Sequence, residues 1–320
     1  MKRFFSGLVV AIAMMIPVLG CHGEPKELKI AIIAPLSGYF VGWGNLVRDG
    51  AQLAIDEWNA KGGILSMKIV LVKEDSKGNP TDAANVAKEA ITKEGIRYFV
   101  GDVFSSLSIP ISDVANASKA ILITPTSTNT AVTVDQSGAT KAYVFRACFS
   151  DPFQGSAGAS FAAKNLKAQK AYVMFDPYDV YVNGLAQAFV DAFTKLGGTI
   201  VGKAIYSNND SDFSKTLAAI SSSMPDVVYL PASSFPLINL VTKQAKDKGI
   251  TATFIGGDFW DSLGLDLKAI DGSYFTSHYW PADPRPEVQA FQMAYNQKYG
   301  ASGTPDIVAG LSYDATNMML

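Results

Sequence analysis

Residues 101–128 read GDVFSSLSIPISDVANASKAILITPTST, and the order of residue types in and around this stretch decides the fold. An apolar run rich in β-forming residues precedes it at 96–100, and a second apolar run occupies 120–123. Between the two runs, consecutive serines offer helix-capping side chains. Pro110 is tolerated only near a helix start, so a helix is expected to begin within residues 105–108. The stretch therefore predicts strand, helix and strand, the repeating unit of a parallel α/β sheet.

Hydroxyl side chains gather where both of these strands end. Ser105 and Ser106 follow the first strand, and Thr126, Ser127 and Thr128 follow the second. Because the carboxyl ends of parallel strands open on one edge of a sheet, we expect these hydroxyls and the free N–H groups of the helix to face one crevice. Such a crevice suits an anion, for example a carboxylate. Ordinary capping and turn chemistry would produce the same residue types, so this alternative stays open.

The alternation of short β-rich runs with helical patterns extends over most of the chain. Strands are expected at 28–33, 67–72, 96–100, 120–123 and 143–146, and in a second array at 171–175, 199–205, 226–230, 253–256 and 273–277. Two such arrays predict an α/β protein with two doubly wound, Rossmann-like lobes joined by hinge crossovers. We expect lobe 1 to comprise residues 26–147 plus 278–320, and lobe 2 residues 148–277. Ligands in such sheets bind at the carboxyl ends of the strands, so a cleft is expected between the lobes.

The N-terminus has the features of a lipoprotein-type signal peptide over residues 1–20. Two basic residues precede an apolar run that is too short to span a membrane, and Val-Leu-Gly before Cys21 resembles a bacterial lipobox. Lipidation of Cys21 would tether the protein to a membrane in the periplasm or at the outer cell surface. Ordinary cleavage that leaves a free Cys21 is the alternative.

Composition argues against several classes of function. A formal net charge of −2 does not favour nucleic acid as a partner. Cys148 is the only cysteine besides Cys21, so no intrachain disulfide is expected. The phosphate-binding and nucleophile-elbow glycine motifs are absent, and the only histidines are His22 and His278. We therefore expect no cofactor, no metal site and no enzymatic activity.

Several short blocks agree in order and spacing with one known family. They are Ala-Pro-Leu-Ser-Gly at 34–38 with Trp-Gly at 43–44, Asn-Ala-Lys-Gly-Gly-Ile at 59–64, Glu-Asp at 74–75, the stretch 101–128, Phe-Arg at 145–146, Gln-Gly at 154–155 and Tyr-Asp-Ala at 313–315. On these blocks the chain resembles the branched-chain amino-acid binding proteins of ABC importers, which are type I periplasmic binding proteins with a Venus-flytrap fold. The family continues well past the Tyr-Asp-Ala helix, so the resemblance implies that this chain is truncated at its C-terminus.

The resemblance implies an extracytoplasmic, monomeric solute-binding protein that holds a branched-chain or other apolar amino acid between its lobes and delivers it to a permease. In that family the ligand carboxylate is held at the positions of Ser105, Thr126 and Thr128. Trp43 stands where an aromatic side chain covers the ligand from lobe 1.

The second lobe supplies the remaining candidates. By resemblance, Asp151 and Tyr181 contribute to the ligand site, and Asp258 stands where an acid receives the ligand's ammonium group. Residues 231–234, Pro-Ala-Ser-Ser, depart from the family because a pocket tyrosine is missing there, which leaves the side-chain specificity open.

Alternatives remain for the roles of single residues and for the function of the protein. Asp151 could cap the helix that follows it, Asp258 could be a turn acid, and Tyr181 could serve packing. The same fold could also bind an aromatic acid or a small amide, or act as a sensory ligand-binding module.

Overall fold

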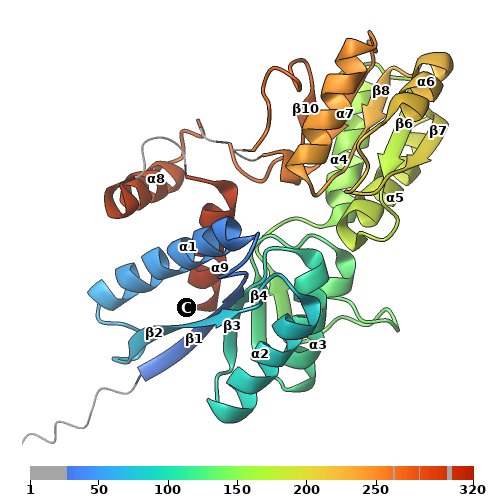
Figure 1. The fold of residues 1–320 in the computed structure, drawn as a ribbon. Coiled ribbons are helices and arrows are strands. Elements are labelled where there is room, and N and C mark those ends of the chain that lie inside the picture. The colour runs from blue at the N-terminus through green and yellow to red at the C-terminus, as the bar shows by residue number, and fades with distance from the viewer. Residues whose placement is uncertain (1–26, 262–263, 281, 301–304) are drawn as a thin grey trace, which may run out of the picture.

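The computed structural model describes residues 27–261, 264–280, 282–300 and 305–320 (Figure 1). The predicted signal peptide and the lipidation site at Cys21 lie outside the described residues. Within them, two separate five-stranded sheets are present, and every strand pair in both sheets is parallel.

The first sheet has the strand order β2-β1-β3-β4-β5. Its strands are β1 (Glu27–Ala34), β2 (Lys68–Asp75), β3 (Tyr98–Gly101), β4 (Ile121–Thr124) and β5 (Val144–Arg146). It packs with α1 (Val41–Ala60), α2 (Pro80–Lys93), α3 (Ser105–Ala117) and α9 (Ile307–Met319), and the short helix η1 (Thr130–Val132) follows β4. Helix α8 (Pro286–Tyr299) packs on α1 and α9 rather than on the sheet.

The second sheet has the strand order β10-β9-β8-β6-β7. Its strands are β6 (Lys170–Phe175), β7 (Thr199–Ile205), β8 (Val227–Tyr229), β9 (Thr253–Gly256) and β10 (Tyr274–Phe275). It packs with α4 (Asp151–Lys164), α5 (Val180–Lys195), α6 (Ser214–Ser223) and α7 (Phe235–Asp247), and the short helix η2 (Asp258–Trp260) follows β9.

Burial explains why each sheet carries helices on both faces. Ile30, Ile32 and Ile33 in β1 are fully buried. Successive side chains of a strand point to opposite faces, so a run that is apolar at every position needs a cover on each side. One face packs against α1 and α9, and the other against α2 and α3. The predicted class, two doubly wound α/β lobes, is confirmed.

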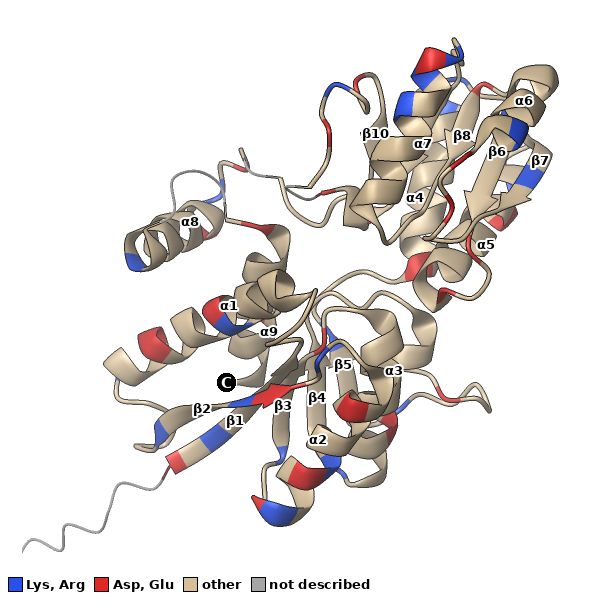
Figure 2. Ribbon diagram, viewed as in Figure 1, with Lys and Arg blue, Asp and Glu red and all other residues tan. Residues whose placement is uncertain are grey.

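The chain passes between the lobes after β5 and again after β10 (Figure 1). Charged residues of both signs are spread over both lobes (Figure 2). No helix in the described part of the chain is both long and apolar enough to cross a bilayer. The lobe limits at 147–148 and 277–278 stay predictions.

The capping of α3 differs from the sequence expectation. Helix α3 begins at Ser105 as expected, but its N-cap residue is Phe104 and no side chain caps it. The serine side chains do not cap because the Ser105 hydroxyl instead accepts a hydrogen bond from the backbone N–H of Asn129, at 3.2 Å.

Helix α9, at the end of the chain, packs in lobe 1 against α1. The backbones approach so closely that a Cβ atom on Gly50 would lie 2.1 Å from the carbonyl oxygen of Ala309. Side chains fasten the same contact: the Ser312 hydroxyl donates to the Val47 carbonyl at 2.7 Å, and the Trp58 indole donates to the Asn317 amide oxygen at 2.9 Å.

This close approach predicts that Gly50→Ala lowers the free energy of unfolding by about 1–3 kcal/mol, because backbone must move to admit the methyl group. Gly42→Ala in the same helix is the matched control, since nothing lies within 4 Å of its added Cβ. Its stability should be unchanged or raised by up to about 1 kcal/mol. Urea denaturation measures both, and equal stabilities would contradict the packing of α9 on α1.

Candidate functional site

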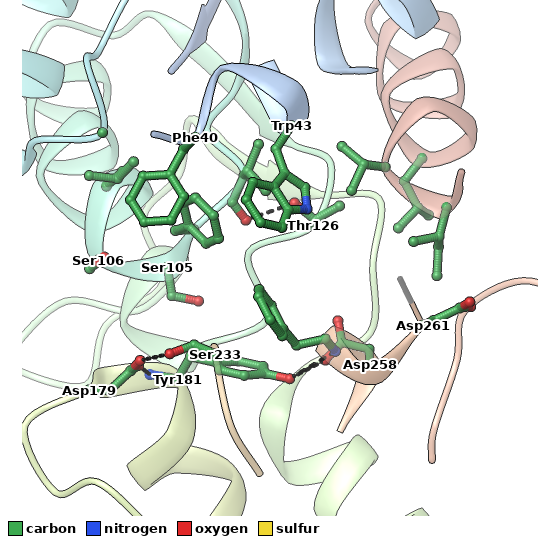
Figure 3. A pocket seen from close by; sticks show the side chains of 18 of the residues that line it. Phe40, Trp43, Ser105, Ser106, Thr126, Asp179, Tyr181, Ser233, Asp258 and Asp261 are labelled. Atoms are coloured by element: carbon green, nitrogen blue, oxygen red, sulfur yellow. Dashed lines mark hydrogen bonds between the residues drawn. The ribbon is translucent and has the colours of Figure 1, made fainter. Parts of the chain in front are cut away.

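A cavity of about 250 Å³ lies between the lobes, at the carboxyl ends of both sheets. Figure 3 shows Phe40, Trp43, Ser105 and Thr126 from lobe 1 on one side of it, and Tyr181, Ser233 and Asp258 from lobe 2 on the other. The rest of the lining comes from neighbouring turns and from the start of α9; it comprises Gly78, Val103, Phe104, Ser106, Leu107, Asp179, Asn208, Phe259, Asp261, His278, Asp306, Ile307, Val308 and Leu311.

The lobe 1 side of the cavity is rich in hydrogen-bond donors. The first N–H groups of α3 have no partner within the helix and point toward the cavity end of the strands. The Ser105 oxygen accepts from the Asn129 N–H, so its own proton remains for an acceptor in the cavity. Thr126 donates its hydroxyl to the Val103 carbonyl at 2.7 Å, which fixes the loop after β4. These features suit a carboxylate.

On the lobe 2 side, Asp258 is a largely buried acid with several donors. Its Oδ1 accepts from the Gln154 amide at 2.8 Å and from the Tyr181 phenol at 2.7 Å, and its Oδ2 lies 3.1 Å from His278 Nε2. Burial alone would raise the pKa of Asp258, but the His278 contact and the two donors together hold that pKa below its ordinary value. Burial and the nearby Asp258 charge raise the pKa of Tyr181 well above its ordinary value, so the phenol stays a neutral donor.

Aromatic rings from both lobes meet between these two sides. Trp43 stacks on Phe235 with ring centroids 5.3 Å apart and lies 5.9 Å from Phe259. On the lobe 1 side, Phe40 and Phe104 pack together at 4.8 Å. Phe235 directly follows the segment 231–234, where the sequence analysis found a pocket tyrosine missing, and Phe259 follows Asp258 after β9. The sequence analysis did not identify either phenylalanine.

The structure brings five of the seven predicted ligand residues to the cavity: Trp43, Ser105, Thr126, Tyr181 and Asp258. Thr128 and Asp151 lie behind the wall, with 0% and 2% of their surface exposed. The Asn129 amide donates to Asp151 Oδ2 at 2.9 Å. Within the described residues, neither Asp151 Oδ1 nor the Thr128 hydroxyl makes a hydrogen bond. This geometry offers neither residue a direct contact with a ligand.

Two further cavity residues carry polar chemistry that the sequence analysis did not assign. His278 is nearly buried, stacks on the Phe149 ring with centroids 3.4 Å apart, and faces Asp258. Asp179 caps α5 through the N–H groups of Tyr181 and Val182 and accepts the Ser233 hydroxyl at 2.5 Å. The sequence carried a signal for His278 alone, as the one histidine within the predicted lobes.

A cavity enclosed by two doubly wound lobes, with donors on one lobe and an acid on the other, defines a two-lobed solute-binding protein. The profile of the periplasmic binding protein family matches residues 27–320, and the chain belongs to that family. The resemblance predicted from the sequence blocks is thereby confirmed, and the family is extracytoplasmic.

Named relatives agree with this assignment. The Leu/Ile/Val-binding protein BraC3 of Rhizobium johnstonii is 36% identical over 257 residues, which cover 78% of this chain and 67% of that protein. The crystal structure of the leucine binding protein LivK from Thermotoga maritima matches with a TM-score of 0.78 at 36% identity, over 90% of this chain and 80% of that chain. LivJ from Streptococcus pneumoniae, in complex with isoleucine, matches with a TM-score of 0.79 at 26% identity, over 92% and 82% of the chains.

The surroundings of Asp258 predict the effect of removing its histidine partner. His278→Gln should raise the pKa of the Asp258 carboxyl, because burial then acts with less compensation. A depressed carboxyl pKa stabilises the fold above the unfolded value of about 3.9 and loses that contribution as the pH falls through the folded value. The variant should therefore unfold more easily at neutral pH.

Carbon-13 NMR titration of the Asp258 carboxyl measures this change directly. Asp75 is the internal control. Its pKa is also lowered against the effect of burial, but by hydrogen bonds from Ser37, Lys77 and Leu36 and not by His278, so it should be the same in the variant. An Asp258 pKa that stays the same in His278→Gln would rule out His278 as its electrostatic partner.

Proposed function

We propose that this protein is the solute-binding component of an ABC importer and that it binds an amino acid with a branched-chain or other apolar side chain between its lobes. The observation that carries the proposal is the chemical contrast across the cavity. Donors at the start of α3, among them the hydroxyls of Ser105 and Ser106, face the acid Asp258 across the cavity, with aromatic rings between them. A zwitterion with an apolar side chain complements all three parts.

Typical interaction free energies indicate which part of the cavity selects amino acids as a class and which part selects the side chain. Hydrogen bonds to charged groups contribute roughly 1.5–3 kcal/mol each, and a micromolar complex needs about 8 kcal/mol. Three or four such bonds to the ligand's two charged ends therefore supply most of that free energy. One methylene in the pocket discriminates by only about 1–3 kcal/mol. The polar ends thus select amino acids as a class, and the aromatic wall selects the side chain.

The proposed mechanism follows from the division of these groups between lobes. The ligand docks on lobe 1 through its carboxylate, and closure brings Asp258 and Tyr181 of lobe 2 to its ammonium group. A ligand that meets both sides only when the cleft is closed shifts the population toward the closed form. The permease would recognise that closed form and receive the amino acid from it. The names of the relatives, which bind leucine, isoleucine or valine, support this ligand class.

Membrane attachment is part of the same proposal. A lipid on Cys21 would hold the monomeric protein at the outer face of a membrane, close to its permease subunits. The protein would bind and release its ligand without turnover and without a cofactor. Belonging to a family of solute-binding proteins supports this role over an enzyme. A role as a sensory module would use the same cleft and the same closure.

One observation favours a second candidate ligand. Asp258 already has three donors among the described residues, so a ligand without an ammonium group leaves no buried charge unpaired. The rings of Trp43, Phe104 and Phe259 in the wall could pack on a flat ligand. An aromatic acid or a small amide would therefore also fit. A thermal-shift screen against amino acids, aromatic acids and amides separates the two candidates.

Substitution at Asp258 tests its role toward the ammonium group. Asp258→Asn should weaken binding of L-leucine by about ten-fold or more, because a charge-assisted hydrogen bond is lost. The desamino analogue 4-methylpentanoate, which has no ammonium group, should bind wild type and variant alike. Isothermal titration calorimetry with both ligands measures the difference, and an equal loss for both would contradict the assignment.

A further inference from the structure

Asn129 connects the two lobes beside the cavity. It lies in the loop after β4 in lobe 1, and its side-chain N–H₂ group donates to Asp151 Oδ2 at 2.9 Å and to the Val180 carbonyl at 2.7 Å. Asp151 begins α4 and Val180 begins α5, so both acceptors belong to helices that pack on the second sheet. One side chain thus makes two hydrogen bonds across the cleft.

The orientation of this amide is fixed from its own side. Asn129 Oδ1 accepts from the backbone N–H of Ala131 at 3.0 Å, which leaves both amide protons for lobe 2. Arg146 holds the loop by donating to the carbonyls of Ser127 and Asn129, at 2.8 and 2.9 Å. The donors therefore face lobe 2 without further ordering of the side chain.

The lobe 2 side has a matching shape. Gly184 lies one turn after Val180 in α5, and a Cβ atom there would be 2.3 Å from Asp151 Oδ2 and 2.8 Å from Asn129 Nδ2. Only glycine leaves room for this contact. Asp151 is 2% exposed, so the hydrogen bond is shielded from water.

The same residue also contacts the cavity. The backbone N–H of Asn129 donates to the Ser105 oxygen at 3.2 Å, which leaves the Ser105 proton available for an acceptor in the cavity. We propose that Asn129 is a positioning residue that favours the closed cleft, by bridging to Asp151 and Val180, and that it orients Ser105 toward the ligand carboxylate. The second part rests on the proposed function, whereas the first does not.

Asp151 gives this bridge a dependence on pH. Burial, chiefly, and the Asp258 charge raise the pKa of Asp151 to about 7, while Thr128, Asn129 and Arg146 act in the opposite direction. The other titratable neighbours, Cys148 and Tyr229, have raised pKa values and stay neutral near pH 7.

The direction of the pH dependence follows from the exposure of Asp151 in the open and in the closed cleft. In an open cleft the carboxyl regains water and an ordinary pKa of about 3.9, so closure takes up a proton between these two values. Closure is therefore favoured below pH 7 and loses this advantage as the pH rises through 7. If closure limits affinity, binding should be about ten-fold tighter at pH 6 than at pH 8.

Distance measurements in the ligand-free protein test the bridge without any assumption about the ligand. Spin labels at Lys88→Cys in α2 and Lys215→Cys in α6, both exposed positions, report the separation of the lobes in a Cys21→Ser background, since Cys148 is buried. Asn129→Ala should shift the distances to larger values. Asn239→Ala is the matched control, because its amide makes two hydrogen bonds within lobe 2, to Gly264 and Asp266, and should leave them unchanged.

Calorimetry with L-leucine at pH 6 and pH 8 completes the experiment. Asn129→Ala should bind about ten-fold more weakly than wild type. Asp151→Asn, a neutral isostere that still accepts from Asn129, should lose the pH dependence, while Asp151→Ala should open the cleft.

The outcomes separate this inference from the proposed function. If wild type does not bind L-leucine, the ligand proposal fails, and the distance distributions still decide the bridge. If Asn129→Ala keeps both the wild-type distances and the wild-type affinity, the bridge is overturned. If Asp151→Asn keeps the wild-type pH dependence, the role of Asp151 in it is overturned.

Discussion

The cleft is organised around one buried carboxylate. Asp258 begins η2, and its partners come from α4 (Gln154), α5 (Tyr181) and the segment that returns to lobe 1 (His278). Removing a charge from water costs several kcal/mol unless donors compensate it, so these segments must meet at one point for the acid to remain charged. The requirement ties the floor of the cavity to the connection between the lobes. It also keeps a negative charge opposite the donor-rich end of α3.

The fold followed from the sequence because its signals are local and repeated. Fully apolar strands such as β1 need helices on both faces, and the alternation of strand and helix patterns along the chain fixes a parallel sheet. The start of α3 was also predicted, whereas its capping was not, because the backbone N–H of Asn129 takes the Ser105 oxygen. This hydrogen bond joins residues 24 positions apart, so it cannot be predicted from the sequence around either residue.

The candidate site was less accessible to sequence reasoning, and the hydroxyl stretch shows why. Ser105 and Thr126 reach the cavity, but Ser108, Thr124 and Ser127 form a buried cluster around the Asp102 carbonyl. Both explanations of the stretch, ligand chemistry and turn chemistry, thus apply to different residues in it. Family position could name Thr128 and Asp151, but only tertiary packing, such as the close approach of α5 to Asp151 at Gly184, decides that they are buried.

The two kinds of contact across the cleft limit what a ligand has to contribute. Trp43 stacks on Phe235, and the Asn129 amide donates to Asp151, so the two lobes contact each other directly at both places. A ligand shifts an equilibrium only by its difference in affinity for the two states, so each interlobe contact lowers the free energy that the ligand must supply for closure. Stronger contacts would close the cleft without cargo, and weaker ones would raise the concentration needed to fill it. Because burial raises the pKa of Asp151 to about 7, a change in pH of one or two units would alter the strength of one of these contacts.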